Sequence, residues 1–417
     1  MLRAGSLFYA LAISVVIAIV SGGLLMAAYF TRIGIRQDET VVELQRNLQS
    51  GLALLLDESF TSTAPVETDL FGHGNDSVEL EKKSWGAFEI ALVKAHRRNR
   101  SQQLAAATGW QNEEATALVL ADLDRPLALA GKTELRGDCY LPKAGIQRAY
   151  IEGQSYLGDR LVYGQEKTSE RFLPPYNEKL VNDLLQLFDF SPGENDSVIT
   201  PQELQLRDSL DHSFFDAPLY VVSSSAISLN NEIISGQVCI VSRQSIHLGK
   251  NAALKNVVLV APKILIDDDV AGEFQAFARD SLIAGKNVQL HYPSVLAVTG
   301  TAKSPDGALL SLGEKSTVMG ELFVCSRAND FRKNVRLQVS SGATVYGSIY
   351  CDGLLDLQGS VSGSVICRKF ELKTNSAVYD NHLLNAVIDR GKRNAAYVGS
   401  SLVPMLHARK TVVQWLQ

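Results

Sequence analysis

Few residues in this sequence are placed to do chemistry. Asp267-Asp268-Asp269 is the one cluster of carboxylates, which are groups that could bind Ca²⁺ or assist a polysaccharide lyase. The cluster aligns with Gly249-Lys250-Asn251 and Gly285-Lys286-Asn287, and this alignment favours a polar turn. The seven histidines are scattered, and the chain has no HExxH, GxSxG, P-loop or helix-opening GxGxxG motif. We therefore predict a protein that is not an enzyme, with no catalytic, metal-binding or cofactor-binding residue.

The five cysteines are spread through the chain without a CxxC pair. Their odd number disfavours a disulfide framework, and their spacings match no zinc motif. We expect most of them to be buried thiols. They are Cys139, Cys239, Cys325, Cys351 and Cys367.

Charge and hydropathy exclude several classes of protein. The net charge is −5 and the mean hydropathy is +0.02, which exclude a nucleic-acid binder held by bulk charge and a membrane protein with many spans. One basic cluster, Lys94 to Arg100, could bind an anion or a polyanionic polymer, but a solvated loop is the favoured interpretation. No nucleic-acid partner is predicted.

The C-terminal half contains a recurring pattern that can position side chains. An apolar-x-apolar pair precedes each copy of a motif in which Gly or Asn lies between two apolar residues. The Gly or Asn should turn the chain with φ above zero. Strand periodicity of two and a step of about 16–18 residues predict a β-solenoid, whose thin coils bury their apolar faces by stacking. The motifs centre on Gly236, Asn256, Gly272, Gly320, Gly347 and Gly363.

The solenoid register predicts which side chains face the core. Residues two and four places after the Gly or Asn should point inward, so Cys351 and Cys367 should stack on adjacent coils. The residues between them point outward and are often apolar, so that face needs a cover, either from this chain or from a partner. The predicted inward pairs are Val238/Ile240, Val258/Val260, Ile349/Cys351 and Val365/Cys367, and the predicted outward residues are Cys239, Leu259, Phe323, Tyr350 and Ile366.

The N-terminal region predicts a membrane anchor. Ser6 to Phe30 carries no charge and is long enough for one transmembrane helix, and no good signal-peptidase site follows it. The residues Val41, Leu44, Leu48, Leu52 and Leu55 then form one apolar stripe on a helix. This stripe packs either on the protein's own next domain or in a seam between subunits.

The membrane orientation follows from the short leader. Arg3 precedes the span and Arg32 and Arg36 follow it, so the positive-inside rule is nearly balanced. A leader of five residues is easily left in the cytoplasm. We expect insertion in the inner (cytoplasmic) membrane with the bulk of the chain in the periplasm or outside the cell.

The N-terminus resembles type IV pilins and pseudopilins. The residues that carry this resemblance are Arg3-Ala4-Gly5-Ser6-Leu7 and the following apolar run, which are most similar to the minor, tip-type members. In that family the chain is cut after the Gly, which corresponds to Gly5. The family's usual Glu at the fifth mature position falls at Ala10 here, which puts that feature in doubt. The C-terminal half also resembles bactofilins, which are polymer-forming solenoids.

Together these patterns predict a mainly β protein with a single membrane anchor. The predicted function is a non-enzymatic structural or assembly protein, with a minor pilin-like component as one candidate. The alternative is a membrane-tethered β-helix carbohydrate-active enzyme. The expected partners of this protein are the lipid bilayer, through residues 6–30, and other protein subunits. A polysaccharide is a possible partner that no motif supports. The predicted divisions are a leader 1–5, an anchor 6–30, an amphipathic helix 31–60, a small α/β or β unit 61–126, a first solenoid coil 127–149, an insertion 150–224, the solenoid 225–385 and a C-terminal cap or docking peptide 386–417.

Overall fold

The computed structural model shows a mainly β chain with an N-terminal apolar helix. It describes residues 4–62, 64–72, 74, 76–193, 196–300, 307–326, 335–404 and 408–416, without the side chains of 4 and 34–38. Residues 1–3 of the predicted leader, with Arg3, therefore lie outside the described residues. The chain divides into two compact units, Met1–Lys82 with Leu92–Leu104 and Lys83–Ala91 with Ala105–Gln417.

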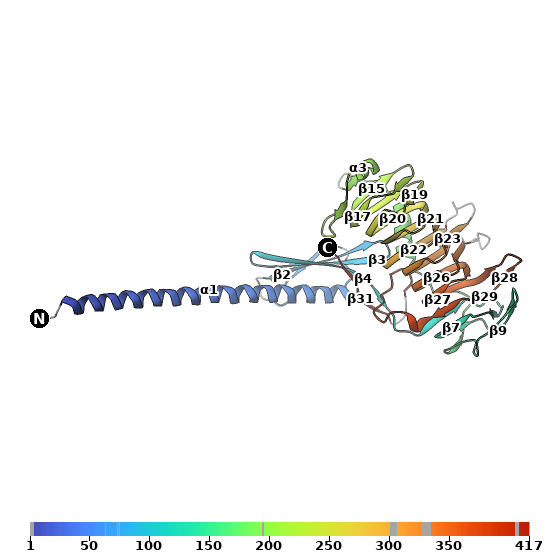
Figure 1. Cartoon of the computed structure of the whole chain (residues 1–417), viewed down its shortest axis with the longest axis horizontal. Coiled ribbons are helices and arrows are strands. Elements are labelled where there is room, and N and C mark those ends of the chain that lie inside the picture. Colours follow the sequence, from blue (N-terminus) through green and yellow to red (C-terminus); the bar gives the residue numbers. More distant parts are fainter. Residues whose placement is uncertain are drawn as a thin grey trace. The chain divides into compact units, whose positions relative to one another are not determined.

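The first unit contains one long helix, α1 (Ala4–Leu56), whose 53 residues span about 80 Å at 1.5 Å per residue (Figure 1). Its part from Gly5 to Ile33 has a mean hydropathy of 2.5 and none of it is buried, and it is long and apolar enough to cross a membrane. The last turns of α1 are partly buried instead of exposed: the side chains of Leu44, Leu48, Leu52 and Leu55 are buried within the chain. The predicted apolar stripe is therefore covered within the chain.

The covering layer in this unit is a small sheet. The strands β1 (Val66–Thr68), β2 (Asp76–Trp85), β3 (Phe88–Arg97) and β4 (Arg100–Gln111) follow one another in the sheet. At Gly51 an added Cβ would come within 2.7–3.2 Å of Val93, Leu80 and Val78, so the helix backbone lies close against β2 and β3. The basic cluster of residues 94–100 is not a loop: it covers the end of β3, a two-residue turn with Arg98 at φ +55°, and the first residue of β4.

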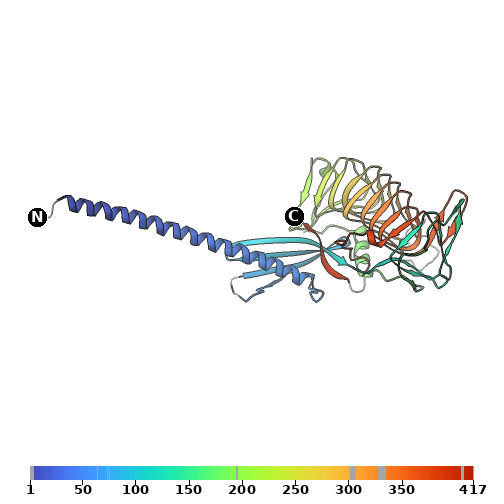
Figure 2. The same cartoon turned by 60° about the horizontal axis from the view of Figure 1, so that its bottom comes forward.

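The second unit is dominated by one largely parallel sheet whose hydrogen-bonded strands close on themselves. Figure 2 shows many of these strands lying side by side. The central strands are β15 (Leu219–Ser223), β16 (Ile227–Leu229), β17 (Ile233–Gly236), β18 (Val238–Ser242), β19 (Ser245–Leu248), β20 (Ala253–Ile266), β21 (Ala271–Ala284), β22 (Gln289–Gly300), β23 (Ala308–Leu312), β24 (Thr317–Ser326), β25 (Val335–Val339), β26 (Thr344–Leu357) and β27 (Ser360–Lys373).

Apolar side chains at matched positions of these strands form the core. Each residue of one such row lies opposite the next across a parallel pair, and all are almost fully buried. The steps along the row are 18 residues from Ile246 to Ile264 but 28 from Leu282 to Leu310, so the step is less uniform than 16–18. The row consists of Ile227, Ile246, Ile264, Leu282, Leu310, Leu337, Leu355 and Phe370.

Glycines form a second row, and here the backbone itself requires them. Gly320 (φ +151°) lies opposite Gly347 (φ +150°), which lies opposite Gly363 (φ +157°). A Cβ on any of them would overlap a backbone carbonyl oxygen of the neighbouring strand. Positive φ was also predicted, and is found, at Gly236 and Asn256. Gly272 lacks it, so the prediction is wrong at that position.

The inward and outward assignment is reversed in one strand. Val258 and Val260 were predicted to face the core and Leu259 to face outward, yet Leu259 is in the core cluster with Val257. The reason is a register shift between Lys255 and Val257, next to Asn256 at φ +60°. One irregular residue inverts every later side chain in a strand, because side chains alternate with a period of two.

Segments far apart in sequence meet in the parallel sheet, which differs from the predicted order. Residues 127–149, predicted as the first coil, include β7 (Glu134–Arg136) and β8 (Asp138–Leu141), and Leu135 lies opposite Ile388 of β30 (Val387–Asp389). This early segment therefore stacks on the late strands. It is joined there by β5 (Thr116–Leu120), whose Leu120 lies opposite Cys367 of β27, and by β12 (Glu166–Thr168).

The predicted insertion also contributes to the sheet. Its β13 (Ser197–Ile199) and β14 (Leu210–His212) pair in parallel with β15 and β17, although the sequence around them is polar. The expected helix within it is α2 (Glu178–Gln186), capped by Asn177 and followed by the 3₁₀ turn η1 (Leu187–Asp189). The short strands β6 (Leu127–Ala130), β9 (Ile146–Arg148), β10 (Tyr150–Ile151) and β11 (Gln154–Ser155) and the helix α3 (Pro201–Gln205) complete this half.

The C-terminal region does not cap the sheet as one segment. After β28 (Val378–Asp380), β29 (His382–Leu384) and β30 comes the 3₁₀ turn η2 (Arg390–Lys392), which lies against β27. The last strand, β31 (Arg409–Leu416), pairs antiparallel with β4, with Lys410 opposite Trp110 and Leu416 opposite Ala105. The edge strand β4, from the early part of the sequence, is therefore paired with the last described strand.

Candidate functional site

The carboxylate cluster Asp267–Asp269 lies in the turn between β20 and β21. Each of its three side chains forms a hydrogen bond or ion pair with a neighbouring strand or the turn that follows it, at 2.6–2.9 Å. These contacts tie the turn between β20 and β21 to neighbouring segments. All three carboxylates are therefore engaged by groups of the same chain. The partners are His247, Lys250, the backbone N–H of Lys286, and Asn287.

The five cysteines are free thiols and all are buried. Cys351 lies directly opposite Cys367 in the parallel pair of β26 and β27, as predicted. Burial raises the pKa of Cys351 and Cys139 to about 12, and a thiol of this kind is a poor nucleophile. Cys139, Cys351 and Cys367 therefore belong to the packing of the core.

The outward apolar side chains are covered by segments of the same chain. Phe323 and Tyr350 stack on each other, and the ring of Tyr176 contacts both edge-on at 5.8 and 6.1 Å. The hydroxyl of Tyr350 donates to the carbonyl of Pro174 at 3.0 Å. The cover over this part of the face thus comes from the segment before α2, which the sequence suggested only as a connector.

Three further contacts continue the cover. Phe190, after η1, stacks on Tyr220 of β15 with ring centroids 4.2 Å apart. The turn between β2 and β3 contacts Gln275 of β21, whose side-chain oxygen accepts from the backbone N–H of Ala87 at 2.7 Å. The indole of Trp85 donates to the carbonyl of Asn256 at 3.2 Å.

A buried carboxylate, Glu321, holds a further covering segment, which contains Tyr397 and Ser400. The backbone N–H of Ser400 donates to it at 2.8 Å, the hydroxyl of Ser400 donates to its other oxygen, and the hydroxyl of Tyr397 lies 3.3 Å away. Burial raises the pKa of Glu321, while these hydrogen bonds oppose the shift. The carboxyl group therefore favours its neutral form more than an exposed Glu does.

Replacing this group gives a pH-dependent prediction. Because the folded protein raises the pKa of Glu321 above 4.5, the stability that it contributes is present at low pH and is lost as the pH rises through the folded pKa. We expect Glu321→Gln to accept from the backbone N–H of Ser400, to donate its amide N–H to the Ser400 hydroxyl, and to raise the unfolding free energy at pH 7 by about 1–3 kcal/mol. Denaturant unfolding between pH 4 and pH 8 measures the difference.

The control for this prediction is Glu58→Gln, because the Glu58 side chain is exposed. We expect that variant to follow the pH dependence of the unmodified protein. An unchanged pH dependence in Glu321→Gln would show that Glu321 is ionised at neutral pH without cost, contrary to the prediction.

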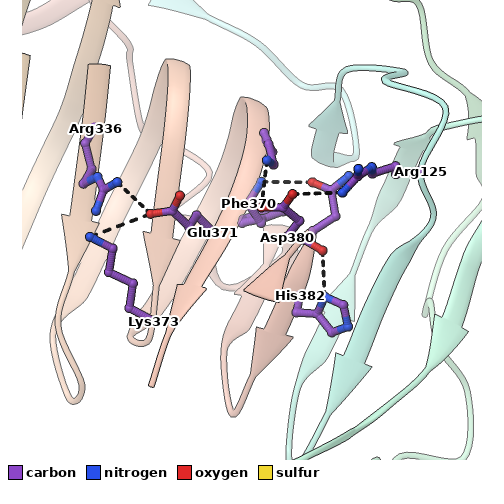
Figure 3. A network of polar contacts seen from close by, with 9 residues as sticks. Arg125, Arg336, Phe370, Glu371, Lys373, Asp380 and His382 are labelled. Carbon is purple, nitrogen blue, oxygen red and sulfur yellow. Dashed lines mark hydrogen bonds and ion pairs between the residues drawn. The ribbon is translucent and has the colours of Figure 1, made fainter. Parts of the chain in front are cut away.

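A network of charged side chains lies along β25, β26 and β27 (Figure 3). Arg336 forms an ion pair with Glu371 at 2.7 Å, and the ammonium of Lys373 is 3.8 Å from the same carboxylate oxygen. The nearby Asp356 is buried, which raises its pKa, and it accepts from the amide of Gln358 at 3.1 Å. This is an arrangement of Asp, Glu, Lys and Arg side chains on successive strands.

The second half of the network centres on Asp380 in β28. Arg125 and Lys369 pair with its carboxylate at 2.9 and 2.7 Å, and its carbonyl contacts the Nδ1 atom of His382 at 2.7 Å (Figure 3). The carboxylates of Glu371 and Asp380 thus each have two cationic partners within the chain. The network ties strands together, and the cations around Glu371 and Asp380 neutralise both carboxylates.

An open pocket of about 660 Å³ lies beside the parallel sheet, where β7 and the turn η2 meet residues 113–115. Arg136 is held at 2.8 Å by Glu134, and its guanidinium lies over the ring of Tyr163. Its Cα partner across the parallel pair is Asp389, which precedes η2. Side chains that line the pocket include Glu113, Glu114, Arg136, Tyr163, Arg390 and Lys392.

Comparisons with protein-family models, curated proteins and solved structures found no match to this chain. Within the residues that the structure describes, no group of three His, Cys, Asp or Glu side chains could hold a metal ion. Sequence reasoning singled out neither Glu321 nor the cations of η2. A signal for each was present, since Glu321 is a carboxylate inside an otherwise apolar strand and Arg390-Gly391-Lys392-Arg393 is a short basic run.

Proposed function

We propose that this chain is a membrane-anchored, non-enzymatic structural or assembly protein. The observation that carries the proposal is the division of α1. Its first part, Gly5–Ile33, is apolar and wholly exposed, whereas its last turns are buried against the protein's own sheet. An exposed apolar helix of this length is stable only in an apolar environment, and a lipid bilayer supplies one.

A minor pilin-like component is the finer form of the proposal. A long helix whose second half packs on a small antiparallel sheet accords with the N-terminal resemblance, and β1 pairs antiparallel with β2 here. The parallel sheet of the second unit is, in this proposal, a β-solenoid that provides an extended binding wall. The N-terminus would lie in the cytoplasm and the bulk of the chain outside it.

Extraction and N-terminal sequencing of the native protein test both levels of the proposal. We expect the protein to remain in membranes through a high-pH carbonate wash and to require detergent for release. If the chain is processed as in pilins, its first residue will be Ser6. Replacing Gly5 by Val is expected to block that cleavage and leave Met1 in place, with membrane attachment unchanged.

The two failures can be told apart. Recovery of the protein in the carbonate wash would contradict the anchor. An intact Met1 in the detergent extract of the unmodified protein would contradict pilin-like processing and leave a plain anchor.

One observation favours a second candidate, a membrane-tethered carbohydrate-active enzyme. Asp356 and Glu371 lie near a shared arginine, and burial raises the pKa of Asp356, which is a property of general acids. Asp356 is nevertheless only 7% exposed and Glu371 is paired with Arg336, so neither carboxylate faces open solvent for a substrate. The structural role is therefore ranked first. Hydrolysis of acidic or neutral polysaccharides that disappears in Asp356→Asn would reverse that ranking.

A further inference from the structure

The pocket beside β7 contains a cation without a carboxylate partner. The guanidinium of Arg390 donates to the carbonyl oxygen of Asn112 at 3.1 Å, and in the described part of the chain it forms no ion pair. Arg393 donates to the same oxygen. Two guanidinium groups therefore converge on one neutral acceptor.

This convergence has an electrostatic cost. Burial, and then the charge of Arg393, lower the pKa of Arg390 to about 10, which still leaves it protonated at neutral pH. The charge of Arg393 is partly balanced by the ring of Tyr397, over which its guanidinium lies, although burial still lowers the pKa of Arg393. Arg390 has no such balance. A partly buried charge of this kind is stabilised by a bound anion.

The remaining pocket charges restrict what that anion can be. Lys392 is a second cation on the same turn, but it lies 3.8 Å from Asp389, whose carboxylate also accepts from the backbone N–H of Gly391. Glu113 and Glu114 are exposed carboxylates on another side of the pocket. They would repel a multiply charged anion and would accept hydrogen bonds from hydroxyl groups.

The volume and openness of the pocket restrict the class of ligand further. A volume of about 660 Å³ is within the range of small-ligand pockets and exceeds what a simple ion fills. The lining of the pocket includes the small residues Ala115 and Gly137. A ligand that combines one carboxylate with several hydroxyl groups matches these features.

We propose that this pocket binds a sugar that carries a carboxylate, with Arg390 binding the carboxylate and Glu113 and Glu114 accepting from its hydroxyl groups. Lys392 adds a second positive charge, and Arg136, already paired with Glu134, forms the wall beside Tyr163. All of these residues belong to the second unit, so the binding does not depend on the membrane insertion of α1. The proposed ligand class adds a glycan-recognition role to the structural function.

The test uses the full chain in detergent and calorimetric titration with galacturonic acid, which has one carboxylate. Neutral galactose is the matched control ligand, and acetate and inorganic phosphate are the control anions. We expect binding of galacturonic acid, binding at least tenfold weaker for each of the three controls, and a loss of at least tenfold in Arg390→Gln. Arg390→Lys should give an intermediate affinity, because lysine retains the charge but lacks the planar fork.

Two further variants keep the proposal falsifiable. Arg207→Gln changes an exposed arginine away from the pocket and should leave the affinity unchanged. If Arg390→Gln lowers the melting temperature, Glu113→Gln with Glu114→Gln provides the second measurement, with an expected loss of at least threefold. Absence of binding by the unmodified protein, equal binding of phosphate or acetate, or unchanged binding in the Arg390 and Glu113/Glu114 variants would each overturn the proposal.

Discussion

Replacing Gly347 by Ala is expected to destabilise the second unit by about 2–5 kcal/mol. The backbone at Gly347 has φ +150°, which L side chains rarely adopt, and an added Cβ would overlap the carbonyl oxygen of Gly320. The same Cβ would lie 2.7 Å from the hydroxyl of Tyr397, which covers this row of glycines. Because the obstacle is backbone from the adjacent strand, no side-chain rotation can relieve it. Denaturant unfolding of the full chain in detergent, followed by near-ultraviolet circular dichroism, measures the loss.

The matched control separates backbone strain from the clash. Gly145 has φ +76°, and a Cβ there would meet no atom within 4 Å. We expect Gly145→Ala to cost only about 1 kcal/mol, from the strain of the positive φ alone. Equal losses in the two variants would mean that the close approach of Gly347 to Gly320 makes no contribution to stability.

Placing a charge in the buried stripe of α1 should have a comparably large effect on the first unit. Leu44 is 1% exposed, so Leu44→Asp removes a fully buried side chain and places a carboxylate among apolar groups. The loss of the leucine alone costs about 2–5 kcal/mol, and the desolvated charge adds to it. We expect α1 to detach from β2 and β3. Hydrogen exchange of residues 76–82 and 92–104, measured by mass spectrometry, should lose most of its protection.

Leu54 lies on the same helix but is 44% exposed, so Leu54→Asp is the matched control. It should leave the exchange of the sheet almost unchanged. Retained protection in Leu44→Asp would mean that the sheet is stable without the helix, and that the buried stripe is not what holds α1 to this unit.

Much of the local structure was predictable because it depends on short-range periodicity. The uncharged run after Gly5 and the stripe through Leu44 and Leu48 indicate one helix with two environments, and both are found. The apolar-x-apolar pairs were aligned with each other from spacing alone, and Leu310 does lie opposite Leu337. Cys351 and Cys367 lie opposite each other for the same reason.

What could not be predicted depends on contacts between distant segments or on one irregular residue. The bulge at Asn256 reverses which of Val258 and Leu259 faces the core, and a two-residue pattern cannot show where such a bulge lies. The pairing of Leu120 with Cys367 joins residues that share no local signal. The polar composition around β13 concealed a strand that the neighbouring β15 stabilises by pairing.

The sites were harder to predict than the fold. Glu321 acquires its character from Ser400 and Tyr397, and the pocket cation Arg390 from Asn112 and Arg393. In both cases the chemistry comes from burial and from the absence of a compensating charge in the described chain. Neither the burial of a side chain nor the lack of a compensating charge can be read from residue type and spacing. The carboxylate cluster Asp267–Asp269, which had the most conspicuous composition, is engaged in ties between turns.

The pairing of Leu120 with Cys367 also has a consequence for the order in which the molecule can be built. The two residues are 247 positions apart, so on the ribosome β5 emerges long before its parallel partner exists. The strands from β15 to β27 can add one after another as they are synthesised, whereas β5, β7 and β8 must wait with an unpaired edge. We expect this early segment to join last, after translation of β27 and β30, and to be the part of the nascent chain that most needs protection from aggregation.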